Sequence, residues 1–175
     1  FFLLLILPAV NAEAKEVSLV KGDAIRYMGY STHYYYVDGN LAFCLEPDMK
    51  SPGNGAYSAS ELDPKSHLSK TMYYMYGGPG YEQYIKSSLT GGWGEDANAY
   101  CLTHCVLSYI YDGCDQNSAA FKGLNADIAS AVVMYADYVK NLPDIPDAEL
   151  AFSENGLTAY YDREQKCQRT QSIRL

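Results

Sequence analysis

Basic residues are scarce in this chain of 175 residues, which carries 13 Lys and Arg against 21 Asp and Glu and has a net charge of −8. A nucleic-acid-binding surface needs clustered Lys and Arg to neutralise phosphates, so we expect no nucleic-acid partner. After residue 14 the chain also lacks an apolar run of the roughly 20 residues that cross a bilayer. We therefore expect no membrane-spanning segment in the mature chain.

Two further signatures are missing from the sequence. The segment Gly77-Gly78-Pro79-Gly80 has no phosphate-loop Lys, so it indicates a turn. The five cysteines form no Cys-x-x-Cys pair of the kind that structural zinc sites use. A weaker zinc hypothesis remains, since Cys101, His104 and Cys105 would share a helix face and Cys114 would supply a fourth ligand. We expect no metal and no other cofactor.

The beginning of the chain has the pattern of an export signal. Residues 1–10 are almost entirely apolar, and the segments Val10-Asn11-Ala12 and Ala12-Glu13-Ala14 have small residues at the positions that signal peptidase reads. We interpret residues 1–14 as a signal peptide truncated at its N-terminus, with a buried strand as the alternative. Residues 15–175 are then one domain by size, large enough to bury a core. An exported acidic module is expected.

An odd number of cysteines in an exported chain leaves at least one thiol unpaired. We assign that role to Cys44. The other four allow three pairings, between which the sequence does not choose, or are free buried thiols that behave as small apolar side chains. They are Cys101, Cys105, Cys114 and Cys167. The 18 Tyr residues favour one of two interpretations. They form a binding surface, or they are strand residues whose side-chain hydroxyls lie in water.

Strand signals occur toward both ends of the chain, and helix signals lie between them. The turn Asp38-Gly39 suits a tight hairpin between strands at 33–37 and 41–45. Alternation along the second strand places Leu41, Phe43 and Leu45 on one face and Cys44 on the other. Pro47 would then end the strand.

The remaining elements complete an order of strands, helices and strands. The first strand is expected at residues 17–27. Helices are expected near 64–76, 97–111 and 125–141, and later strands near 149–152, 157–161 and 166–175. This order predicts an α+β fold, in which both chain ends form a mostly antiparallel β-sheet and the helices are an insertion in the middle.

On the second expected helix, His104 shares its face with Tyr100, Cys101, Leu107, Ser108 and Tyr111, by spacings of three and four. The motifs of this region and of the Cys44 strand together resemble the internal thioester domain of Gram-positive surface adhesins and pilus-tip proteins. The resemblance runs from about residue 17 to 175. It is carried by Phe43-Cys44-Leu45-Glu46-Pro47, Ser51-Pro52, Gly55-Ala56-Tyr57 and Thr103-His104 leading to Ser108-Tyr109.

The resemblance implies an extracellular, cell-surface or cell-wall-associated adhesion domain, followed by further domains of a longer surface protein. In that family a cysteine is joined to a glutamine side chain with loss of ammonia, and the buried thioester then reacts with an amine on a host protein. A thioester lasts only while packing excludes water and amines. Cys44 matches the thioester cysteine. The glutamine is expected directly after Thr103, where this chain has His104.

Imidazole has no acyl carbon, so His104 leaves three hypotheses open. In the first hypothesis, the domain attaches to host or neighbouring-cell proteins without a thioester bond at this position. Alternatively, Cys44 bonds to another amide, for which the chain offers Gln83, Gln116, Gln165, Gln168 and Gln171.

The third hypothesis is a transamidase or cysteine peptidase with Cys44 as nucleophile and His104 as base, oriented by Asp96, Asn98 or Asp112. A buried, hydrogen-bonded His104 is the structural alternative. We expect a surface adhesion domain that attaches covalently or non-covalently, and not an enzyme.

Overall fold

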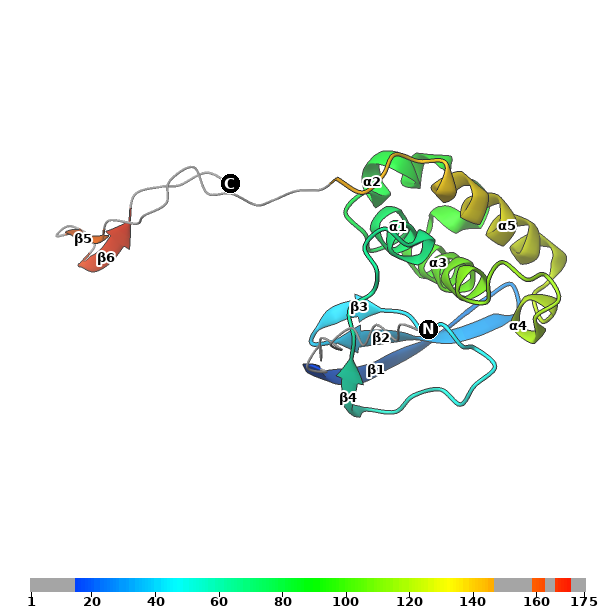
Figure 1. The fold of residues 1–175 in the computed structure, drawn as a ribbon, viewed down its shortest axis with the longest axis horizontal. Helices are drawn as coiled ribbons and strands as arrows, with labels where there is room; N and C mark the ends of the chain where they lie inside the picture. The colour runs from blue at the N-terminus through cyan, green and yellow to red at the C-terminus, as the bar shows by residue number, and fades with distance from the viewer. Residues whose placement is uncertain (1–14, 147–158, 163–165, 171–175) are drawn as a thin grey trace, which may run out of the picture. The chain divides into compact units, whose positions relative to one another are not determined.

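The computed structural model describes residues 15–146, 159–162 and 166–170 (Figure 1). The predicted signal peptide and the expected strand at 149–152 lie outside the described residues. The chain divides into two compact units, Phe1–Ile145 and Pro146–Leu175, which we describe separately. Within the described ranges, none of the helices combines the length and the apolar character needed to span a bilayer.

A four-stranded antiparallel sheet forms one layer of the first unit. Its strands are β1 (Lys15–Tyr27), β2 (Tyr30–Val37), β3 (Asn40–Ala42) and β4 (Gly55–Ala59), in the order β3-β2-β1-β4. Two-residue turns at Met28-Gly29 and Asp38-Gly39 join the first three strands, with positive φ at all four positions. Such turns match the twist of paired strands, which is why Asp-Gly predicted the second hairpin.

The hairpin differs from the expectation at its far end. β3 stops at Ala42 rather than continuing to Leu45, so Cys44 follows the strand instead of lying within it. The Tyr100 hydroxyl of a helix donates to the carbonyls of Ala42 and His33 at the point where the pairing would continue. β4 was missed, because its sequence Gly-Ala-Tyr-Ser-Ala has few large apolar residues.

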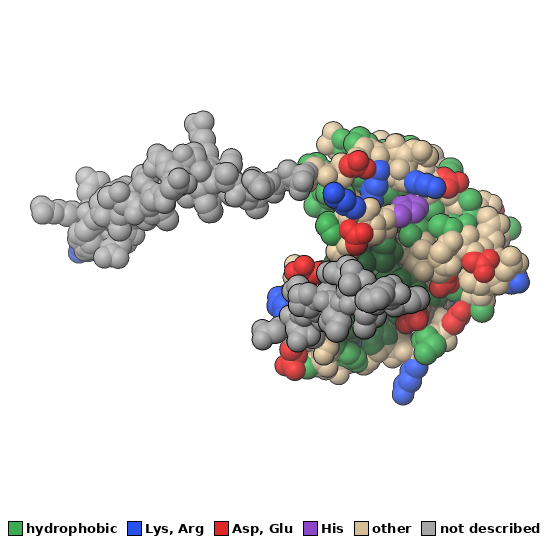
Figure 2. Space-filling model, viewed as in Figure 1, with side chains coloured by type: hydrophobic (Ala, Val, Ile, Leu, Met, Phe, Trp, Pro, Cys, Tyr) green, Lys and Arg blue, Asp and Glu red, His purple; other side chains and the backbone are tan. Residues whose placement is uncertain are grey.

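Helices form the second layer of the first unit (Figure 1). The three expected helices are confirmed, and the short α2 and α4 and two 3-10 turns, η1 and η2, were missed. Their bounds are α1 His67–Tyr74, α2 Tyr81–Tyr84, η1 Lys86–Ser88, η2 Gly91–Gly94, α3 Asp96–Tyr111, α4 Ala119–Lys122 and α5 Ala126–Lys140. α3 lies between the sheet and the outer helices α1 and α5, so most of its residues are buried. The face of this unit drawn in Figure 2 carries dispersed acidic and basic side chains.

The second unit contains β5 (Ala159–Asp162) and β6 (Cys167–Thr170), which pair with each other in an antiparallel two-stranded sheet. The α+β class is therefore confirmed. The expectation that both chain ends share one sheet is wrong for the described strands, because the four-stranded sheet comes entirely from the N-terminal part. A local hairpin satisfies the backbone groups of β5 and β6 without the distant strands.

Candidate functional site

Three polar side chains of α3 face the segment that carries Cys44. They belong to Tyr100, His104 and Ser108, which are spaced four residues apart. The Tyr100 hydroxyl lies 2.8 Å from the carbonyl oxygen of Ala42 and 3.0 Å from that of His33. About two turns further along α3, the Ser108 hydroxyl donates to the carbonyl oxygen of Leu45 at 2.9 Å. The stacked rings of Phe43 and Tyr100, 4.8 Å apart, add apolar contact. These bonds hold residues 42–45 against the helix.

Cys44 and His104 line the same cavity, which has a volume of about 190 Å³. Cys44 is half-buried, and its Sγ lies 3.7 Å from the carbonyl oxygen of Glu46, to which the thiol donates. Cys44 is not part of the apolar cluster that Phe43 joins, although it follows the strand whose alternation was expected to place it. The structure brings the two candidate residues to one site.

His104 is almost completely buried, with 2% of its surface exposed. Its Nδ1 lies 2.9 Å from the hydroxyl oxygen of Thr32 on β2. Its Nε2 has no hydrogen-bond partner among the described residues, although the backbone of Cys44 faces the ring. Burial lowers the pKa of His104 to about 4, and the Cys44 backbone opposes only part of this change. The imidazole is therefore neutral near pH 7.

This geometry does not contain a nucleophile and base in contact. The Cys44 thiol donates to a backbone carbonyl, and the hydrogen bond of the His104 ring goes to Thr32. Among the expected orienting residues, Asn98 donates to the Gly92 carbonyl at 2.7 Å instead. His104 thus acts as the buried, hydrogen-bonded histidine of the structural hypothesis and connects α3 to β2.

Cys101, Cys105 and Cys114 are also free thiols. Cys101 and Cys105 are buried in α3, while Cys114 is exposed after its C-terminus. Burial raises the pKa of Cys101 to about 11 and raises the pKa of Cys105 further, so both stay protonated. Across residues 15–146 and the described parts of the second unit, no three His, Cys, Asp or Glu side chains gather as a metal site would require.

Sequence reasoning missed two contributors to this site. Thr32 was not singled out, although alternation along β2 places it on the same face as Tyr30 and Tyr34, which pack on the core. The wall formed by the loop after Cys44 was also missed. There the hydroxyls of Tyr35 and Ser51 lie 2.6 Å apart and fix the loop to β2. No sequence motif predicts such a contact, because the contact depends on how the loop folds back onto β2.

These features define an α+β domain in which a helix positions a cysteine-bearing segment at the edge of a sheet. A family model described as thioester domain matches residues 16–146. The chain therefore belongs to the thioester-domain family, and the resemblance seen in its motifs is confirmed. Neither the curated proteins nor the solved structures contain a match.

Proposed function

We propose that this chain is an extracellular surface attachment domain of the thioester family in which Cys44 persists as a free thiol. It binds a protein on a host or neighbouring cell, and it does so without an internal thioester and without catalytic turnover. Family membership supports the attachment role, because thioester domains are typical of extracellular surface proteins.

The observation that carries the proposal is the residue opposite the Cys44 segment. His104 lies on the face of α3 between Tyr100 and Ser108, which bond the carbonyls on either side of Cys44. An internal thioester needs an acyl carbon at this place, and imidazole has none. The resemblance implies a glutamine at this position, directly after Thr103, so His104 in its place would leave the site without an acyl donor.

The two glutamines of the first unit do not favour the alternative of a bond elsewhere. Gln83 and Gln116 are exposed, and neither lines the cavity at Cys44. Gln168 belongs to β6 in the second unit, and Gln165 and Gln171 lie outside the described residues. The Cys–His enzyme is not favoured either, because an imidazole with a pKa of about 4 is a weak base at neutral pH.

The chemical state of Cys44 tests the proposal. The intact mass of the purified chain should equal the mass calculated from its sequence, and treatment with methylamine should not change it. The Cys44→Ala variant should differ only by the change of side chain. A deficit of one ammonia that methylamine removes, and that Cys44→Ala abolishes, would show a thioester and overturn the proposal.

Binding to intact cells tests the attachment role. The labelled chain should bind and then be released by a denaturing wash, and Cys44→Ala should leave the same amount resistant to the wash as the original chain. A resistant fraction that requires Cys44 would instead show covalent attachment.

A further inference from the structure

The cavity beside Cys44 lies against a part of β2 that pairs with β1 on one side and has no neighbouring strand on its other side in the described structure. β3 pairs only with residues 35–37 of β2. Tyr27 and Tyr30 flank a two-residue turn, so they form a hydrogen-bonded pair and Tyr30 directs its backbone groups toward β1. Because the direction alternates, Ser31 and His33 direct their backbone groups toward the free edge.

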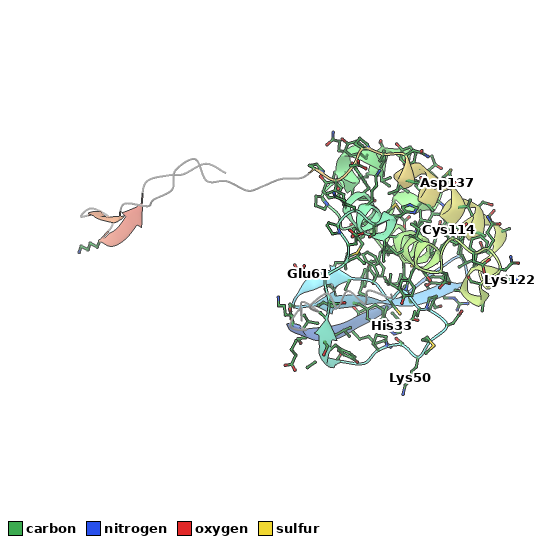
Figure 3. All side chains as sticks on the ribbon, viewed as in Figure 1. His33, Lys50, Glu61, Cys114, Lys122 and Asp137 are labelled. Atoms are coloured by element: carbon green, nitrogen blue, oxygen red, sulfur yellow. The ribbon has the colours of Figure 1, made fainter. Side chains whose placement is uncertain are left out.

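The free edge supplies hydrogen-bond donors to the cavity. The carbonyl of His33 is occupied by the Tyr100 hydroxyl at 3.0 Å. The N–H groups of Ser31 and His33 have no strand opposite them in the described residues, and both residues line the cavity. His33 is labelled in Figure 3, where it lies in the sheet. An occupant with an acceptor oxygen would satisfy these donors.

The Nε2 of His104, which lies beside the Cys44 backbone and has no partner of hydrogen-bonding geometry among the described residues, is a third polar group at this site. His104 lines the cavity and is 2% exposed, and its Nδ1 is already bonded to Thr32. A buried polar nitrogen without a partner is unfavourable, so a group that hydrogen-bonds to Nε2 would be bound more tightly.

The charge and the size of the cavity restrict the occupant. None of the described residues that line it is Lys, Arg, Asp or Glu, so an ionised group would be desolvated there without a counter-charge. The cavity volume of about 190 Å³ equals that of roughly six water molecules, which suits one side-chain head group and not a folded segment.

We propose that this cavity binds the uncharged carboxamide of a partner protein's glutamine or asparagine side chain beside the Cys44 thiol. The carboxamide oxygen accepts from the N–H groups of Ser31 and His33, and its NH₂ group faces His104 Nε2. A carboxamide supplies both an acceptor and two donors without a charge. The inference rests on the proposed function, because an internal thioester would occupy the same thiol.

Two alkylating reagents test this preference directly. With iodoacetamide and iodoacetate, the thiolate sulfur forms a bond to the CH₂ carbon as the carbon–iodine bond breaks and iodide leaves. The two reagents differ only in whether that carbon carries a carboxamide or a carboxylate. Exposed Cys114, among the helices in Figure 3, reports the effect of the net charge in the same molecule. We expect the ratio of iodoacetamide to iodoacetate rates to be about tenfold higher at Cys44 than at Cys114, measured by peptide mass spectrometry.

A backbone variant tests whether the free edge contributes. Ser31→Pro removes one N–H that none of the described strands uses, and proline is tolerated at such an edge position. We expect this variant to lower the rate ratio at Cys44 toward that at Cys114. Competition on the original chain adds a measurement that does not depend on folding of the variant. N-acetylglutamine amide should slow alkylation of Cys44 and N-acetylglutamate should not.

Equal rate ratios at Cys44 and Cys114 in a chain of full mass would overturn the inference and leave the proposed function standing. Equal competition by N-acetylglutamine amide and N-acetylglutamate would overturn it as well. A chain that lacks one ammonia and whose Cys44 resists both reagents would instead overturn the proposed function, and this inference with it.

Discussion

The two sides of helix α3 are both buried, but they are held in different ways. One side carries Leu102 and Val106, which are fully buried in the apolar core with residues of α1 and α5. The other side carries Tyr100, His104 and Ser108, which hydrogen-bond to β2 and to the Cys44 segment. Apolar contact is non-directional, whereas hydrogen bonds fix positions. The first side therefore supplies stability, and the second sets the geometry of the site.

The apolar side should be the more sensitive to truncation. Leu102 has no exposed surface, so Leu102→Ala leaves a cavity and should lower the free energy of unfolding by about 2–5 kcal/mol. Met134 on α5 is 55% exposed, and Met134→Ala should change it by less than about 0.5 kcal/mol. Urea denaturation measures both values. A similar loss in the two variants would contradict the assigned core.

On the polar side, the Tyr100 hydroxyl should matter more than its small size suggests. Tyr100→Phe leaves the carbonyls of Ala42 and His33 without this donor and should cost about 1–3 kcal/mol of unfolding free energy. Tyr81 is the matched control, because its buried hydroxyl has no partner among the described residues. Tyr81→Phe should be neutral or slightly stabilising, and the same urea experiment compares the two. Equal effects would refute the bonding role of Tyr100.

Acid should weaken the polar side through His104. Its ordinary pKa of 6.5 falls to about 4 in the folded protein, so the unfolded chain takes up a proton first as the pH drops. The stability is complete above pH 6.5 and is lost progressively toward pH 4. Between pH 7 and pH 5 the loss from His104 should be about 2 kcal/mol.

His104→Asn, whose amide can take the place of Nδ1 beside Thr32, should remove this pH-dependent loss in denaturation curves. Burial also lowers the pKa of His67, so His67→Asn serves as the control. It should remove a different part of the pH-dependent loss of stability from the part that His104→Asn removes. An unchanged pH profile in His104→Asn would show that His104 is not the group responsible.

The smallest effect is expected at the end of the polar side. Ser108→Ala removes the bond to the Leu45 carbonyl and should cost about 1 kcal/mol, because this single neutral hydrogen bond is partly buried. The loss should accompany faster alkylation of Cys44 by iodoacetamide, since the segment is held less firmly. A slower reaction would contradict the positioning role of Ser108.

The sequence predicted the parts of this structure that depend on local patterns. The Asp38-Gly39 turn and the three longer helices followed from turn chemistry and periodicity. The early end of β3 did not, because Tyr100, which donates to the Ala42 carbonyl there, lies more than 50 residues away. The bond between Thr32 and His104 joins residues 72 positions apart, and no local signal announces it.

The His104→Gln variant tests the central claim most directly, because it places an acyl carbon where the imidazole lies beside the Cys44 segment. The original chain should show its full intact mass. His104→Gln should lose one ammonia, methylamine should cancel the deficit, and the double variant with Cys44→Ala should show none. An ammonia deficit already present in the original chain, or a full mass in His104→Gln, would contradict the claim that residue 104 determines the state of this thiol.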